Sequence, residues 1–244
     1  MNQALLDLDP LALAPLDRGG FDVGWDHARH GLLPPPELLA GTTPVSQGWS
    51  AGKAVYGRRA LRASRTTRLW LALRLQAWQE GVAFDGTQIT PEFLGRLDTH
   101  RCPVRRTALG GPSGHADAFV VERLNPAAGF IAGNLVAMSH AAQQCGAGID
   151  SLQARRFARR CEIDRSEIRG LDAGGWWRMA VLRSFATVLP FHEAARLPLA
   201  ALPADTLRPV NAPQRLQALV TKQFSAPGWA ARARLMASAL PEHT

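Results

Sequence analysis

Cysteine is scarce in this sequence. Three cysteines occur in 244 residues, widely spaced and without a Cys-x-x-Cys pair: Cys102, Cys145 and Cys161. An odd number of isolated thiols excludes a disulfide scaffold and leaves too few sulfurs for a four-cysteine zinc site. We therefore expect a cytoplasmic protein with reduced thiols and no structural zinc. Because Cys102 has no partner at metal spacing, we expect it to pack as a small buried hydrophobe.

Long apolar runs are also missing. No stretch of about 18 uncharged apolar residues occurs, which argues against a transmembrane helix. The first residues include Asp7, Asp9 and Asp17 and lack a basic segment, so they do not resemble a signal peptide. Hydrophobic residues nevertheless make up 46% of the chain, which is enough for a globular core in one sizeable domain or two small ones.

Acidic residues are absent between Glu37 and Glu80. Within this span lie Lys53 and six arginines: Arg58, Arg59, Arg62, Arg65, Arg68 and Arg74. The chain has a net charge of +8 and a pI near 10.8, which favours a polyanionic partner. Arginine without a nearby carboxylate favours bidentate phosphate contacts, so we predict that all of these arginines but Arg74 bind nucleic acid. The alternative is a solvated basic face in an arginine-rich chain.

Apolar periodicity predicts that most of the chain is helical. Leu71, Leu75 and Trp78 recur at helical spacing, which predicts a helix over residues 66–79 with Gly81 at its C-cap. Thr90 is placed to cap another helix that begins with proline. Further helices are predicted over residues 151–160, 175–189, 213–224 and 227–240. Trp176 and Trp177 then belong to the core, with a base-stacking platform as the alternative.

The N-terminal part carries two further signals. Residues 1–48 are rich in proline, glycine and turn signals, which predicts a loosely packed arm that aromatic side chains hold to the core. Further on, Arg62, Arg65 and Arg68 recur at i, i+3 spacing. They would share one helix side if the helix of residues 66–79 began early.

Strand-like sequence is confined to residues 100–138. Its first apolar run ends in the acid–base dipeptide Glu122-Arg123, and a proline/glycine turn follows. Asn134 then precedes a second apolar run, after which Ser139 is placed to cap a helix. Asn134 lies twelve residues after Glu122, and Gln143 lies nine residues after Asn134.

This order of parts resembles the HNH (His-Me finger) endonucleases, in the branch that has arginine in place of the first histidine. The resemblance covers about 45 residues and depends on five features: Cys102-Pro103, Glu122-Arg123, Gly129-Phe130, Asn134 and Ser139. It implies a ββα module, a β-hairpin and a helix that hold one divalent metal ion against a phosphodiester.

The resemblance implies a metal site of three residues. Glu122 would bind Mg²⁺ or Mn²⁺, with Gln143 or His140 assisting. Glutamate reaches one methylene further than the aspartate of this branch, so the coordination geometry changes. Gln143 offers one neutral oxygen in the place where the family has histidine or asparagine.

The resemblance also implies the catalytic residues Arg123, Asn134 and His115. Arg123 would hold the scissile phosphate, because its guanidinium stays protonated and cannot act as a base. Asn134 would brace the loop, and His115 or the metal ion would activate water. The alternatives are a hairpin ion pair between Glu122 and Arg123, a left-handed turn at Asn134, and solvent-exposed histidines at His115 and His140.

The sequence thus predicts an α+β protein that is mostly α, with a small HNH-like ββα module between helical segments. Its expected parts are residues 1–95, an N-terminal arm and basic helical segment; residues 96–148, the module; and residues 149–244, a C-terminal helical segment. The expected function is metal-dependent hydrolysis of DNA. The alternatives are an HNH fold that binds nucleic acid without cleavage, and a helical interaction protein in which the ββα insert is only scaffolding.

Overall fold

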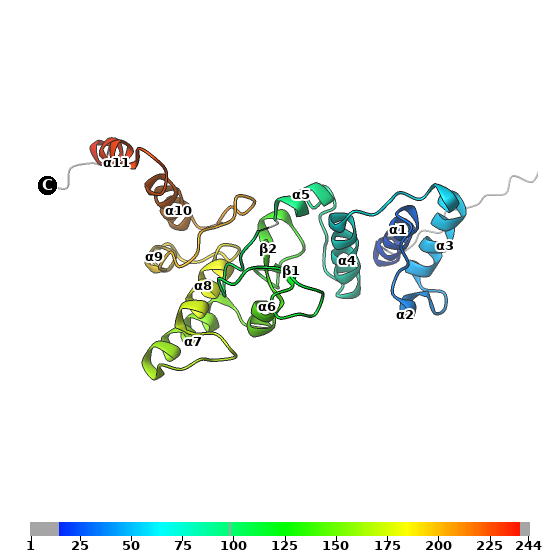
Figure 1. Ribbon diagram of the computed structural model, residues 1–244, viewed down its shortest axis with the longest axis horizontal. Helices are drawn as coiled ribbons and strands as arrows, with labels where there is room; N and C mark the ends of the chain where they lie inside the picture. The colour runs from blue at the N-terminus through cyan, green and yellow to red at the C-terminus, as the bar shows by residue number, and fades with distance from the viewer. Residues whose placement is uncertain (1–14, 98, 240–244) are drawn as a thin grey trace, which may run out of the picture. The chain divides into compact units, whose positions relative to one another are not determined.

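A computed structural model describes residues 15–97 and 99–239 of the chain. The chain divides into two compact units, Met1–Gly95 and Arg96–Thr244. Helices predominate, and the sheet of the described residues has two strands, β1 and β2 (Figure 1). The predicted class, α+β and mostly α, is therefore confirmed. In the part of the chain that is described, no helix is long and apolar enough to cross a membrane.

The first unit is built from helices. Its elements are α1 (Pro15–Arg29), α2 (Pro36–Leu39), α3 (Pro44–Tyr56), the short 3₁₀ helix η1 (Gly57–Arg59), α4 (Arg65–Gln79) and α5 (Pro91–Arg96). Ser64 caps α4 by accepting a hydrogen bond from the Thr67 amide at 3.0 Å. Gly81, with a φ of 64°, follows its end. The helix predicted over residues 66–79 is confirmed within one residue. Arg62 precedes it, so the expected helix side shared by Arg62, Arg65 and Arg68 is wrong.

Helices α1 and α3 lie in backbone contact. A Cβ added at Gly24 would lie 2.0 Å from the Val45 carbonyl oxygen, and one at Gly48 would lie 1.9 Å from that of Phe21. Only glycine permits this approach. Residues 15–48 are therefore not the loosely packed arm expected from their glycine and proline content, because packing against α3 offsets the low helix propensity of glycine in α1. Residues 1–14 of that expected arm lie outside the described residues.

The second unit contains the hairpin and the remaining helices. Strands β1 (Phe119–Arg123) and β2 (Leu135–Ser139) pair antiparallel, and the short η2 (Ala132–Asn134) precedes β2. The helices that follow are α6 (His140–Gly146), α7 (Ser151–Asp164), α8 (Ala173–Ser184), α9 (Phe191–Arg196), α10 (Ala212–Phe224) and α11 (Trp229–Ser238). Ser139 caps α6 as predicted, since its hydroxyl accepts a hydrogen bond from the Ala142 amide at 3.3 Å.

One hydrophobic core joins the hairpin to α6, α7 and α8. It includes Leu124 and Met138 from the hairpin region and Trp176 and Met179 from α8, none of them more than 1% exposed. The predicted core position of Trp176 is confirmed. Cys102 is fully buried beside Ser139 in the same core, as expected for a small hydrophobe. Because both sides of residue 148 contribute to this core, the ββα segment and the C-terminal helices are not separate bodies.

Candidate functional site

Asn134 holds the loop that joins the two strands. Its side chain is 1% exposed. Its Oδ1 accepts a hydrogen bond from the Asn125 amide at 2.8 Å, and its Nδ2 donates to the carbonyl oxygens of Asn125 at 2.9 Å and Gly129 at 3.0 Å. One buried amide thereby satisfies three backbone groups of residues 125–129. Asn134 is positioned to brace the loop, which is the geometry that the predicted role requires.

Glu122 and Gln143 meet across the ββα segment. Glu122 lies on β1 opposite Val136, and Gln143 lies one turn into α6. The Gln143 Nε2 donates a hydrogen bond to the Glu122 Oε2 at 2.7 Å. The two residues are 21 positions apart, so the turn geometry of the hairpin and the cap at Ser139 bring them together.

Arg123 is bonded to its own loop. Its Nη1 donates to the carbonyl oxygens of Pro126 at 3.2 Å and Ala128 at 3.4 Å, and its guanidinium lies 4.7 Å from the centre of the Phe130 ring. Neighbouring residues of a strand point to opposite faces, which explains why Arg123 packs on Phe130 while Glu122 contacts Gln143. In this arrangement Arg123 stabilises the loop.

The two candidate histidines lie at the edge of the segment. His115 is exposed in the loop before β1, where its Nδ1 accepts a hydrogen bond from the Asp117 amide at 3.5 Å. His140 is the first residue of α6 and is half-exposed. Within residues 15–97 and 99–239, no three His, Cys, Asp or Glu side chains come together as a group that could hold a metal ion. Glu122, His115 and His140 therefore do not form a shared cluster.

Arg183 is a charged residue of this region that sequence reasoning missed. It lies on α8 and is 2% exposed. Its Nη1 donates to the Leu124 carbonyl at 3.3 Å and its Nη2 to the Gly146 carbonyl at 2.7 Å. Burial lowers the pKa of Arg183, whereas the charges of Glu122 and Asp150 raise it. The available signal was a single arginine in the apolar run of residues 179–189, because a charge on a buried helix face needs compensating partners.

The residues around Glu122 do not fit the divalent metal site that the resemblance implies. They supply one carboxylate, and the Gln143 side chain turns its amide nitrogen toward that carboxylate. The positive charge of Arg183 acts on the same carboxylate. A cation in this position opposes the binding of a second, doubly charged cation.

The arginines of the first unit face solvent. All five of the predicted nucleic-acid contacts are exposed: Arg58, Arg59, Arg62, Arg65 and Arg68. No acidic side chain in the described part of the chain pairs with Arg58, Arg59, Arg62 or Arg68. The exposure that phosphate binding requires is therefore present at these positions.

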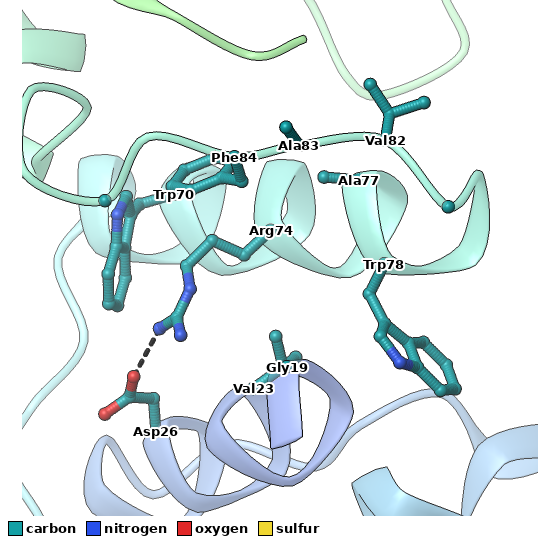
Figure 2. A pocket seen from close by; sticks show the side chains of 12 residues that line it. Gly19, Val23, Asp26, Trp70, Arg74, Ala77, Trp78, Val82, Ala83 and Phe84 are labelled. Atoms are coloured by element: carbon teal, nitrogen blue, oxygen red, sulfur yellow. Dashed lines mark hydrogen bonds and ion pairs between the residues drawn. The ribbon is translucent and has the colours of Figure 1, made fainter. Parts of the chain in front are cut away.

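Arg74, from the same acid-free span, has a different environment. It forms an ion pair with Asp26 of α1, and its guanidinium lies 4.5 Å from the centre of the Trp70 ring. Figure 2 shows Trp70, Arg74 and Trp78 along α4, with Arg74 pointing toward Asp26. These residues line a pocket of about 700 Å³ that belongs to the first unit. Arg74 is thus part of the helix packing.

Comparisons with known proteins leave the chain without a relative. No protein-family model matches it, no curated protein is detectably similar in sequence, and no solved structure is detectably similar in fold.

Proposed function

We propose that this chain binds nucleic acid and that residues 96–148 form an HNH-like ββα module without a metal centre of its own. The observation that carries the proposal is the set of exposed arginines that have no acidic partner among the described residues: Arg58, Arg59, Arg62 and Arg68. Arginine in this state offers a planar, permanently charged fork to phosphate. The Asn134 brace and the contact of Gln143 with Glu122 support an HNH-like interpretation of the hairpin and α6. A cytoplasmic location is part of the proposal.

The proposal is tested by the salt dependence of binding. Fluorescence anisotropy should be measured with labelled duplex DNA, single-stranded DNA and RNA of unrelated sequences between about 50 and 200 mM salt. Changing Arg58, Arg62 and Arg68 to Gln should weaken binding by a similar factor for every sequence. On duplex DNA the salt slope should fall by about 0.9 for each phosphate that the variant no longer neutralises.

A matched control removes the same charge elsewhere. Three exposed arginines of the second unit serve this purpose when changed to Gln: Arg156, Arg208 and Arg234. This control variant should keep most of the binding and the salt slope of the unchanged chain. Equal losses in both variants would mean that net charge alone attracts the polyanion. A flat salt profile of the unchanged chain would overturn nucleic-acid binding as a function.

A DNA endonuclease that uses Mg²⁺ or Mn²⁺ is the second candidate. One observation favours it: the residues in the two family ligand positions, Glu122 and Gln143, lie within 2.7 Å of each other. A divalent ion in such a site supplies Lewis-acid stabilisation of the phosphoryl oxygen. Among the chain's own residues, Glu122 would be the one essential carboxylate.

Plasmid nicking separates the two candidates. Purified chain is incubated with supercoiled DNA and Mg²⁺ or Mn²⁺, beside Glu122→Ala and the exposed-carboxylate control Glu167→Gln. The binding proposal predicts that none of the three nicks the plasmid. Nicking by the unchanged chain and by Glu167→Gln, but not by Glu122→Ala, would establish the endonuclease instead.

A further inference from the structure

Arg183 connects the ends of the two elements that carry Glu122 and Gln143. Its two hydrogen bonds go to Leu124, directly after β1, and to Gly146, the last residue of α6. A Cβ added at Gly146 would lie 3.0 Å from the Arg183 Nη2, so glycine leaves room for the guanidinium at this helix end. The charge of α8 is thereby held beside the ββα segment by direct contacts.

The environment of this guanidinium requires a negative charge. A buried cation loses its hydration and is tolerated only with compensating partners. The Gly146 carbonyl provides the negative end of α6, but the Arg183 Nε has no hydrogen-bond partner among the described residues. Two carboxylates act on Arg183 electrostatically, those of Glu122 and Asp150. Asp150 is exposed and caps α7, whereas Glu122 is half-buried against α6.

We propose that Arg183 is the built-in counter-ion of Glu122 and takes the electrostatic role that a divalent cation has in HNH-like modules. The Glu122–Gln143 pair is then a latent cation site, which Arg183 keeps closed to metal. Removal of the Arg183 charge opens it to Mn²⁺. The inference concerns the charge balance of residues 122, 143 and 183 and does not depend on nucleic-acid binding.

The test is thermal unfolding of the full chain with and without Mn²⁺. Arg183→Met should lower the Tm by about 6 °C or more in EDTA, because it leaves Glu122 without its counter-ion. Millimolar Mn²⁺ should then raise the Tm of Arg183→Met by about 3 °C or more and leave that of the unchanged chain where it was. Equal effects of Mn²⁺ on both proteins would overturn the proposal.

Three control variants assign the effect to the Arg183–Glu122 pair. Arg183→Lys keeps the charge and should show no Mn²⁺ response. Adding Glu122→Gln to Arg183→Met removes both charges, so the double variant should have a higher Tm than Arg183→Met and no Mn²⁺ response. Asp150→Asn keeps a good helix cap and should behave like the unchanged chain. A Mn²⁺ response that survives Glu122→Gln would contradict the assignment.

A second variant covers the case in which Arg183→Met does not fold. Glu122→Gln alone leaves Arg183 buried without its counter-ion and should lower the Tm in EDTA by several degrees. Glu122→Asp, which keeps the charge, should lower it less. If Glu122→Gln unfolds at the same temperature as the unchanged chain, Arg183 does not depend on Glu122 and the inference is wrong.

Discussion

The two units use their polar residues differently. In the first unit the arginines of residues 58–68 are exposed, and α1 and α3 are joined through glycine-mediated backbone contact. In the second unit Asn134 and Arg183 are 1% and 2% exposed and bond to backbone carbonyls. It follows that charge can be removed from the first unit without loss of fold, whereas polar residues of the second unit hold its hairpin together.

The largest effect should come from breaking the backbone contact of the first unit. In Gly48→Ala the new Cβ would lie 1.9 Å from the Phe21 carbonyl oxygen, so α1 and α3 must separate. We expect a loss of more than about 3 kcal/mol in the free energy of unfolding, at the upper end for overpacking. Hydrogen exchange in α1 and α3 would measure it. Gly95→Ala, whose Cβ would meet only Thr66 at 3.8 Å, is the tolerated control; an equally large loss there would contradict this account.

The second unit is tested by Asn134→Ala. This change leaves one amide and two carbonyls of residues 125–129 without their side-chain partner. We expect a loss of about 2–3 kcal/mol in the free energy of unfolding, measured by urea denaturation. Asn134→Asp keeps the acceptor for the Asn125 amide and loses both donated bonds, so it should also destabilise the hairpin. A loss below about 0.5 kcal/mol for Asn134→Ala would show that the loop does not need its brace.

A smaller effect is expected at the ion pair between α1 and α4. The side chains of Arg74 and Asp26 are 17% and 18% exposed, so their attraction is only partly screened. Arg74→Met also removes the guanidinium from the Trp70 ring, and we expect a loss of about 1–2 kcal/mol. Arg68→Gln, on an exposed position of the same helix, should change the free energy of unfolding by less than about 0.5 kcal/mol. Similar losses in the two variants would erase the distinction between buried and exposed arginines.

The smallest effect concerns acid stability of the first unit. Burial lowers the pKa of His27 below its ordinary value of 6.5, and its Nδ1 is 2.8 Å from the Val23 carbonyl oxygen. Because the unfolded chain takes up the proton at higher pH than the native state does, stability should fall as the pH drops below about 6.5. Urea denaturation between about pH 7.5 and 5, at roughly half-unit steps, would measure this slope. It should be shallower in His27→Gln; an unchanged slope would assign the acid sensitivity to other groups.

Local signals in the sequence were sufficient where a side chain acts on its own neighbours. The helix of residues 66–79, the cap at Ser139 and the core position of Trp176 follow from periodicity and capping chemistry, and all three are confirmed. The spacing of Glu122, Asn134 and Gln143 predicted a braced hairpin with two facing side chains, and these contacts are present. The role of this site in binding or cleavage stays a prediction.

Contacts between distant segments account for the differences. The sequence of α1, with Gly19, Gly20 and Gly24, favours a loose arm, and only the close approach of α3 makes a helix stable there. Helix α9 was not predicted, because its six residues are too few for a periodic signal. Arg123 had two open roles until Phe130 and the loop carbonyls of residues 126 and 128 were seen to hold it.

Residue types and their spacing were enough to predict the fold class, most helices, the place of the hairpin around Glu122 and the basic character of residues 58–68. Each of these depends on interactions within about a dozen residues or on composition. The three-dimensional arrangement was needed to find that Arg183, 61 positions after Glu122, supplies the positive charge beside it. Burial and charge neutralisation depend on which distant elements pack together, and a linear pattern of residue types does not record that packing.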